Sequence, residues 1–563
     1  MNKKFLLPFL ALAVILTFPA CSGKLTPLSE QYVKAEPQPL EVIGGEIPVT
    51  INATFPAKWF NKNAVVKVTP LLRYGIGETW GTSYTFQGEK VKANDKVVPY
   101  AAGGNATMRT TFEYTPSMKK SELFLTFEAK IKNKTVKLPP IKIADGVIAT
   151  SALADAATAT PAIGADMFQR IIKEKYDAEI MFLIQQAELR SKELTKTEIQ
   201  EWQNLVENAD QAPNQNVAIE ISAYASPDGG VKLNDALAER REKNTNAYLN
   251  KELSKRKVDV PIDARYTAQD WDGFRELVSK STLQDKDLVL SVLSMYNDPE
   301  QREREIKNIS AVFKQLADDI LPQLRRSRLT ANIEIIGKSD EEIAALAKNN
   351  AGSLTVEELL YAATLTSNDA EKETIYTKAT SIFANDYRTW NNVGMQRFIA
   401  GDFDKATEMF NKSNSVKSNS EANVNLGLLA LLKGDKSKAQ QLFGNASDVP
   451  ELGQALGLLY LQQGDYAKAV SSFAGTKSNN AALAQILTKD YSTAAQTLNA
   501  VKKQDAITDY LKAVVAARTN DANGVVSNLK AAISKDRTLA KEAGDDLEFA
   551  KFINNSAFTD LLK

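Results

Sequence analysis

The sequence predicts a multidomain protein with an N-terminal β-sandwich, a central α/β domain and a C-terminal α-helical repeat solenoid. Apolar and polar residues alternate up to about residue 150, which is typical of half-buried strands. Strand-like apolar runs then alternate with helical spacing over 166–340, and a helical motif recurs after residue 341. A chain of 563 residues is long enough for three or four domains.

The first residues are typical of a secretory signal. Two lysines precede an apolar run over 5–16, which is too short to span a membrane, and a small residue, Ala20, follows. The chain's only cysteine, Cys21, comes next. This arrangement resembles the lipobox of bacterial lipoproteins, although Phe18 and Pro19 replace the usual aliphatic and small residues. The alternative is a plain signal peptide.

The lipoprotein resemblance implies that residues 1–21 form the lipoprotein signal peptide and that Cys21 carries lipid. Several acyl chains would then anchor the protein stably to the outer membrane. Residues 22–25 contain no acidic run, which some relatives of this lipoprotein type use for surface export. We therefore expect the body to face the periplasm, with surface exposure left open.

The composition excludes several classes of chemistry. The chain has no histidine, and its one thiol is assigned to lipid, so His- or Cys-based catalysis, zinc or haem ligation and disulfides are not expected. No paired-acid motif or phosphate loop stands out, so we predict no catalytic residue, metal or cofactor. An enzyme that uses a carboxylate pair remains a remote alternative. The 69 basic and 69 acidic residues balance, which argues against nucleic-acid binding.

Residues 25–150 are predicted to form the β-sandwich. Period-two alternation is clearest over 46–54, 64–69 and 121–128, with Gly-Gly pairs between runs. We expect a small antiparallel sandwich of about seven strands. Residues 151–165 are rich in Ala and Thr, so they bury little surface and are predicted to be a linker.

Residues 166–340 are predicted to form the central α/β domain. The expected elements alternate between strand and helix, with a helical insertion before the last strand. They are strand 178–184, helix 195–208, strand 217–225, helix 234–249, insertion 270–325 and strand 330–336.

A motif in this region resembles that of OmpA-like peptidoglycan-associated domains. The strand and loop over 221–230 lead to Asn234, Leu237, Arg241 and Tyr248-Leu249 with the family's spacing. The version with Ser226-Pro227-Asp228-Gly229, followed further on by Asp270-Trp-Asp-Gly273 and Leu324-Arg-Arg326, is similar to the Bacteroidota branch. The resemblance implies an OmpA-like fold that contacts peptidoglycan.

The resemblance also implies a site. The diaminopimelate of peptidoglycan carries an ammonium and a carboxylate, which a carboxylate and a guanidinium would grip. The family's arginine lies seven residues after the motif asparagine, at Arg241, but its aspartate position, eight residues before Asn234, holds Ser226. Asp228 is the substitute candidate, so the predicted peptidoglycan-binding residues are Arg241, Asp228, Ser226 and Asn234. Alternatively, the domain has lost its ligand and Arg241 pairs with Glu242 or Asp228.

Residues 341–563 are predicted to be almost entirely helical. Gly394, Gly427 and Gly457 open three copies of one motif at intervals of 33 and 30 residues, and a Gly-Asp pair follows each glycine seven residues later. These copies resemble tetratricopeptide repeats. Small residues would let paired helices approach, and each Gly-Asp pair would make a turn and cap the second helix. We expect five or six helix pairs from about residue 353.

The repeat resemblance implies a concave groove that binds a protein partner. The candidate contacts on first helices are Asn391, Asn392, Arg397 and Asn425. A purely structural spacer is the alternative.

Together, these features predict an outer-membrane lipoprotein that acts as a periplasmic scaffold. It would contact peptidoglycan through the OmpA-like domain and a protein partner through the repeats. Two alternatives remain open: an assembly adaptor that does not bind peptidoglycan, and a surface or fimbria-associated adhesin component.

Overall fold

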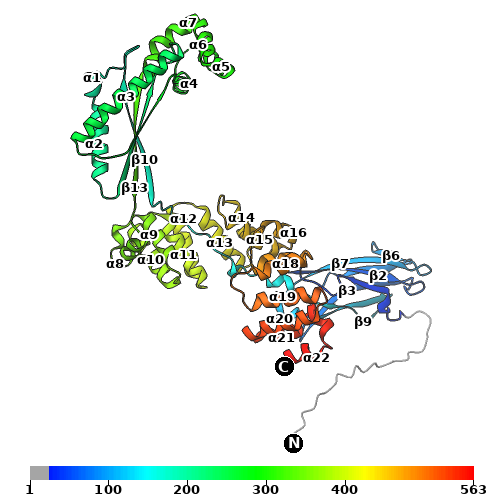
Figure 1. Cartoon of the computed structure of the whole chain (residues 1–563). Coiled ribbons are helices and arrows are strands. Elements are labelled where there is room, and N and C mark those ends of the chain that lie inside the picture. The colour runs from blue at the N-terminus through cyan, green and yellow to red at the C-terminus, as the bar shows by residue number, and fades with distance from the viewer. Residues whose placement is uncertain (1–24, 284) are drawn as a thin grey trace. The chain divides into compact units, whose positions relative to one another are not determined.

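The computed structural model describes residues 25–283 and 285–563, so the signal peptide predicted for 1–21 and Cys21 lie outside the described residues. The chain divides into two compact units (Figure 1). The sandwich–repeat unit combines the residues up to 165 with 368–563, and the inserted unit comprises 166–367. The N-terminal β region and the helical repeats, which are far apart in sequence, therefore form one body.

The described residues 25–146 form nine strands in two sheets, two more than expected. The smaller sheet has the order β1-β2-β7, with bounds Val33–Glu36, Glu46–Phe55 and Gly104–Glu113. The larger sheet has the order β6-β5-β3-β8-β9, and β4 also pairs with β3. Its strands are β3 (Ala64–Tyr74), β4 (Gly77–Trp80), β5 (Tyr84–Gly88), β6 (Lys96–Val98), β8 (Ser121–Ile131) and β9 (Lys134–Gly146). Strands β1, β4 and β6 are only three or four residues long, so a period-two pattern has few positions in which to show itself.

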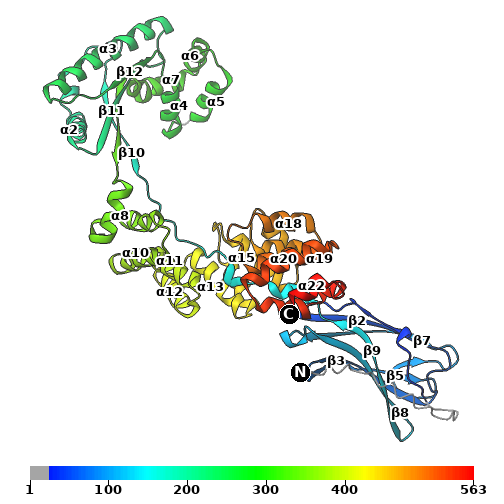
Figure 2. The same ribbon diagram turned by 60° about the horizontal axis from the view of Figure 1, so that its bottom comes forward.

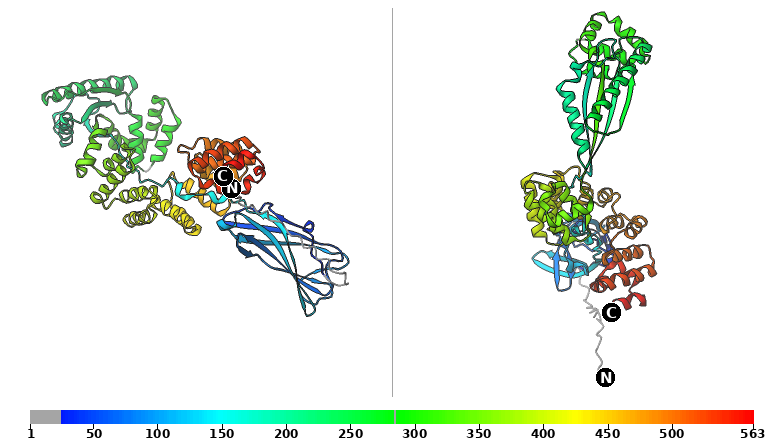
Figure 3. Two further views of the ribbon diagram at one scale, coloured as in Figure 1. Left: turned by 90° about the horizontal axis from the view of Figure 1, so that it is seen from below. Right: turned by 60° about the vertical axis from the view of Figure 1, so that its left-hand side comes forward.

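The sandwich docks onto the repeats at one end only, as the blue strands in the left panel of Figure 3 show. There, Lys119 Nζ lies 2.7 Å from Glu542 Oε2, and Lys120 Nζ lies 3.4 Å from Asp545 Oδ1. Lys436 Nζ donates to the carbonyl oxygen of Gly44 at 2.9 Å. These polar contacts tie the two parts of the sandwich–repeat unit together.

The repeats form five helix pairs within 368–563, a range that the structure describes throughout, after a leading helix α10 at Asp369–Ile382. The pairs are α11/α12 (Tyr387–Ile399, Phe403–Val416), α13/α14 (Ser420–Leu432, Lys436–Gly444), α15/α16 (Leu452–Gln463, Tyr466–Ser472), α17/α18 (Asn479–Leu487, Tyr491–Asn499) and α19/α20 (Ala506–Arg518, Ala522–Lys535). Helices α21 (Thr538–Asp545) and α22 (Ser556–Leu561) follow.

The predicted turn chemistry is confirmed. Gly401, Gly434 and Gly464 adopt left-handed conformations, with φ of 77°, 75° and 81°. In each case the next residue is an aspartate whose side chain caps the following helix by accepting a backbone N–H. The last two pairs keep the aspartate cap but place Lys489 and Asn520 in the left-handed position.

Each repeat glycine makes room for a ring on the second helix of its pair. A Cβ on Gly427 would lie 2.2 Å from Cε1 of Phe443, and a Cβ on Gly394 would lie 2.6 Å from Cε1 of Phe410. Both rings are buried. The glycines therefore set how closely the paired helices approach.

The inserted unit contains a four-stranded sheet of order β10-β13-β11-β12, in which only β11 and β12 run parallel. In sequence order the strands are β10 Ile171–Met181, β11 Gln215–Tyr224, β12 Ile262–Thr267 and β13 Arg326–Ile336. Helices α2 (Thr197–Gln211) and α3 (Val231–Lys255) pack on the sheet (Figure 2). The sequence analysis missed β12, which is short and mostly exposed.

Seven further α-helices lie in the described residues of the inserted unit. They are α1 (Ser191–Leu194), α4 (Trp271–Lys280), α5 (Lys286–Met295), α6 (Pro299–Asn308), α8 (Asp340–Asn349) and α9 (Val356–Ala362), and the short α7 (Ser310–Gln315) follows α6. The expected boundary at 340/341 shifts to 367/368, because α8 and α9 pack with the inserted unit. Arg170 pairs with Asp340, and the rings of Phe168 and Tyr361 stack at 4.4 Å.

We expect Gly427→Ala to lower the free energy of unfolding by about 1–2 kcal/mol. The added methyl group would overpack against Phe443 at a cost of about 1–3 kcal/mol, which alanine's better helix propensity offsets only in part. Thermal unfolding followed by far-UV circular dichroism measures the effect. Gly444→Ala is the control, because a Cβ there has no neighbour within 4 Å. Equal stability of the two variants would contradict the packing argument.

Candidate functional site

The first helices of the repeat pairs carry buried side-chain amides at equivalent positions. Asn392, Asn425 and Asn480 lie on α11, α13 and α17, two residues before Gly394, Gly427 and Ala482, and all three are buried. The equivalent residue on α15 is Ala455, and its neighbour Gln454 supplies an amide instead.

Each of these amides binds both the N–H and the C=O of one backbone residue. Asn425 accepts from the N–H of Ala162 at 2.7 Å and donates to its carbonyl oxygen at 2.8 Å. Asn392 makes the same pair of bonds to Gly164, at 2.8 and 2.9 Å. Asn480 does so to Asp155 at 3.0 and 2.8 Å, and Gln454 to Thr160 at 3.4 and 2.7 Å. We call these four side chains the amide ladder.

The occupant of the groove is the chain's own segment 155–164, seen in cyan among the yellow and orange helices of Figure 1. Ala156, Ala159 and Ala162 are buried and join the hydrophobic cluster of the repeats. A Cβ on Gly164 would lie 3.0 Å from Cα of Arg388. The prediction that 151–165 is a loose linker is therefore wrong: small side chains bury little in isolation, but they are the ones that fit a narrow groove.

The four residues predicted to bind a protein partner are engaged within the chain. Asn391 Nδ2 donates to the carbonyl oxygen of Ala162 at 3.0 Å, alongside the bonds from Asn392 and Asn425. Arg397 pairs with Glu373 of α10 and lies 3.9 Å from Asp402. These positions therefore hold the chain's own backbone and helices, which corrects their expected role. The sequence analysis missed Gln454 and Asn480, although an amide just before the small residue of each repeat was a signal for them.

In the inserted unit, the loop between β11 and α3 gathers the residues predicted to bind peptidoglycan. Asn234 is buried at the start of α3, and its Nδ2 donates to the carbonyl oxygens of Ser226 at 3.0 Å and Gly229 at 2.8 Å. It therefore closes the loop on itself, and its amide N–H groups are directed at the chain rather than at a ligand.

Arg241 is fully buried below the same loop. Its guanidinium donates to the carbonyl oxygens of Gln186 at 2.9 Å, Tyr224 at 2.7 Å and Leu183 at 3.2 Å. Burial lowers the pKa of Arg241 to about 10. The prediction that Arg241 grips a ligand is corrected, because all three nitrogens serve backbone carbonyls. The alternative pairing with Glu242 or Asp228 is not what the structure shows either.

The ion pair of this loop is formed by Asp228 and Arg325. Arg325 Nη2 lies 3.0 Å from Asp228 Oδ2, and the two side chains are 12% and 18% exposed. Ser226 Oγ donates to Asp228 Oδ1 at 2.6 Å, and Arg325 Nε lies 3.4 Å from Ser226 Oγ. The predicted Ser226 and Asp228 thus lie together, while the cation, Arg325, lies just before β13. The Leu324-Arg-Arg326 sequence was the only signal for it.

A second, deeper ion pair stands beside the first. Arg326 Nη2 lies 3.0 Å from Asp270 Oδ2, and the backbone N–H of Gly273 donates to Asp270 Oδ1 at 2.8 Å. Burial raises the pKa of Asp270 above its usual value, against the opposing effects of the Gly273 N–H and Arg326. A Cβ on Gly273 would lie 2.3 Å from Asp270 Oδ2, so a larger residue there would displace the buried carboxylate.

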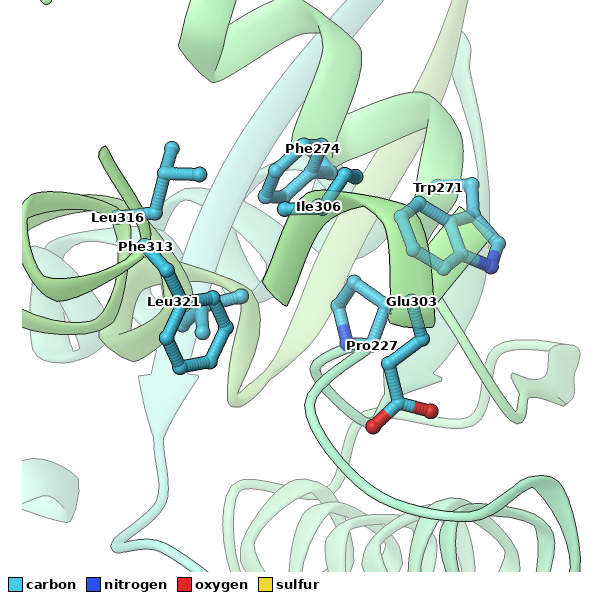
Figure 4. A pocket seen from close by; sticks show the side chains of 8 residues that line it. All are labelled: Pro227, Trp271, Phe274, Glu303, Ile306, Phe313, Leu316 and Leu321. Atoms are coloured by element: carbon cyan, nitrogen blue, oxygen red, sulfur yellow. The ribbon is translucent and has the colours of Figure 1, made fainter. Parts of the chain in front are cut away.

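The adjacent pocket is too small for an organic ligand. It is lined mainly by Pro227, Trp271, Phe274 and neighbouring apolar side chains, with Glu303 at its rim (Figure 4). Its volume of about 10 Å³ corresponds to about one water molecule. Within 25–283 and 285–563, no cluster of three or more acidic, His or Cys side chains is arranged to hold a metal ion. Across the same residues, no helix has the length and apolar character needed to cross a membrane.

Several solved structures resemble part of this chain. A tetratricopeptide repeat protein from Parabacteroides merdae is 16% identical over 46% of this chain and 96% of its own, with a TM-score of 0.28. PilF of Pseudomonas aeruginosa is 18% identical over 38% of this chain and 98% of its own, with a TM-score of 0.27. Yeast Tom70 is 13% identical over 58% of this chain and 74% of its own, with a TM-score of 0.26. Because these TM-scores are low, the helical-repeat assignment rests on the chain's own helix pairs. No protein-family model matches the sequence, and no curated protein does.

We expect Asn425→Ala to loosen the segment in the groove. The change would leave the buried N–H of Ala162 without its acceptor, at a cost of about 1–3 kcal/mol, while Asn391 would still donate to the carbonyl oxygen of Ala162. Hydrogen exchange in a peptide covering 155–165 should accelerate at least about tenfold. Asn445→Ala, at an exposed asparagine after α14, should leave exchange unchanged. Equal protection in both variants would show that the ladder does not hold the segment.

We expect Arg241→Ala to destabilise the inserted unit by about 3–5 kcal/mol, because removal of the guanidinium leaves three partly buried carbonyl oxygens without donors. Chemical unfolding measures the effect. Arg240→Ala changes the adjacent, exposed arginine and should stay within about 0.5 kcal/mol of the unmodified protein. A stable Arg241→Ala variant would contradict the structural role given to this residue.

Proposed function

We propose that this protein is a non-catalytic scaffold of the bacterial cell envelope. Lipid on Cys21 would hold it to the outer membrane with its body in the periplasm, and the OmpA-like motif of the inserted unit would contact peptidoglycan. The observation that carries the proposal is the ion pair of Asp228 and Arg325 beside Ser226, in the loop where the motif predicts the ligand.

The pair has the chemistry that a zwitterionic ligand requires. Diaminopimelate carries an ammonium and a carboxylate on one carbon, and Asp228 and Arg325 hold an anion and a cation 3.0 Å apart. If the ligand enters between them, the Asp228–Arg325 ion pair is replaced by two, one between Asp228 and the ligand ammonium and one between Arg325 and the ligand carboxylate. The planar guanidinium can bind the carboxylate in a bidentate manner. Arg325 thus supplies the guanidinium that the motif places at the buried Arg241.

The sandwich–repeat unit supports the scaffold part of the proposal. The repeats hold their own segment 155–164 and bind the end of the sandwich, so they join distant parts of the chain into one body. Because the groove amides are engaged, a protein partner would bind another face of the repeats.

Co-sedimentation of the lipid-free chain 22–563 with purified diaminopimelate-type peptidoglycan tests the wall contact. We expect Asp228→Asn and Arg325→Gln each to lower the bound-to-free ratio about tenfold or more, because each removes a charge-assisted hydrogen bond worth about 1.5–3 kcal/mol. Arg265→Gln is the matched control, since Arg265 pairs with Asp263 at 3.0 Å on an exposed part of the same sheet.

Two outcomes would overturn the wall contact. The first is that the unmodified chain fails to pellet with peptidoglycan at both low and moderate salt. The second is that all three variants pellet as well as the unmodified chain does. Circular dichroism of each variant separates a lost ligand contact from a lost fold.

A further inference from the structure

The chain enters the sandwich at the end opposite the repeats. Trp59, in the loop between β2 and β3, donates its indole N–H to the carbonyl oxygen of Thr26 at 2.9 Å. Leu28 is buried in the sandwich core, and Val33 of β1 pairs with Ala53 near the end of β2. The first described residues therefore lie where β2 and β8 end and where β3 and β9 begin.

Three connections at this same end are rich in lysine, and we call them together the basic end. Residues 56–63, 89–96 and 128–137 contain nine lysines and three acids, although the whole chain has equal numbers of basic and acidic residues. Glu30 adds one acid nearby. The lysines are Lys58, Lys62, Lys90, Lys92, Lys96, Lys130, Lys132, Lys134 and Lys137.

Backbone contacts join these connections into one surface. The N–H of Lys90 donates to the carbonyl oxygen of Lys62 at 2.9 Å, and the N–H of Lys58 donates to that of Tyr100 at 2.6 Å. Pairing of Ala64 with Ile131 places the β8–β9 turn beside the start of β3. The lysines are therefore held at one end of a folded sandwich rather than on separate flexible loops.

Most of this charge is available for an outside partner. Lys62 pairs with Glu89 at 3.1 Å, and Lys96 donates to the carbonyl oxygen of Asn105 at 2.7 Å. The turn lysines Lys130, Lys132 and Lys134 are exposed, and no acid in the described part of the chain lies within ion-pair distance of them. The docked end differs, because its lysines face acids of α21.

The length of chain before Leu25 limits how far this end can stand from a membrane. Only four residue steps separate Cys21 from Leu25. At about 3.3–3.6 Å per residue they span at most about 14 Å. This step rests on the lipidation in the proposed function. A lipid on Cys21 would thus bring the basic end close to the headgroups, where charge acts over a screening length of about 8–10 Å.

We propose that the basic end of the sandwich binds the surface of an anionic lipid bilayer and orients the sandwich on the membrane. Lysine ammonium groups are attracted to lipid phosphates, and each lysine near such a surface strengthens binding about fivefold. The four-residue tether and the excess of lysines favour the bilayer over other polyanions, because the tether keeps this end next to lipid.

Vesicle co-sedimentation of the lipid-free chain 22–563 tests the proposal without relying on the lipid. Vesicles of phosphatidylcholine with 30% phosphatidylglycerol should bind the chain, whereas pure phosphatidylcholine should not, and binding should fall as salt rises. The triple variant K130Q/K132Q/K134Q should lower the bound-to-free ratio about 100-fold. K477Q/K502Q/K503Q removes three exposed lysines from the repeats and should have little effect.

Several results would overturn the proposal. They are equal binding to both kinds of vesicle, no binding to either at low salt, or equal losses in the two triple variants. If K130Q/K132Q/K134Q instead lost binding to purified peptidoglycan and kept binding to vesicles, the basic end would face the wall. The wall contact is tested separately, by the binding of the Asp228→Asn and Arg325→Gln variants to peptidoglycan, so the two proposals can fail independently.

Discussion

The structure depends most on the amide ladder that holds segment 155–164 in the groove of the repeats. The side chains of Asn392, Asn425, Gln454 and Asn480 each satisfy both polar groups of one backbone residue, and two of these residues, Ala162 and Gly164, are buried. Without such partners, each buried N–H or C=O would cost about 1–3 kcal/mol. The ladder therefore makes burial of an irregular segment favourable, and that segment leads from the sandwich to the inserted unit.

The sequence was sufficient where a local pattern determines the structure. The Gly-Asp turns at 401, 434 and 464 need a left-handed residue followed by a helix cap, and both requirements are visible in two letters. The burial of 155–164 was not visible. It depends on a groove built more than 220 residues later, and an Ala/Thr-rich stretch has the same composition whether it is solvated or enclosed.

The motif of the inserted unit predicted Arg241 as the cation beside its loop, but the ion pair of that loop is formed by Arg325. Arg241 has the family spacing, yet the carbonyl oxygens of Leu183 and Gln186, in a segment outside the motif, enclose its guanidinium. Arg325 stands 97 residues after its partner Asp228, so no local spacing connects the two. Spacing along one helix can predict which residues share a face, but burial by other segments decides which of them reach a ligand.

The chain segments just before and just after the inserted unit are both held by contacts within the sandwich–repeat unit. Before it, Gly164 is held by Asn392, and Arg388 donates to the carbonyl oxygen of Ala165 at 3.2 Å. After it, α10 is tied to α11 by the ion pair of Glu373 with Arg397. Both chain crossings therefore lead to α11, since Asn392, Arg388 and Arg397 all belong to that helix. A load on the inserted unit would therefore reach one helix of the repeats through both chain crossings.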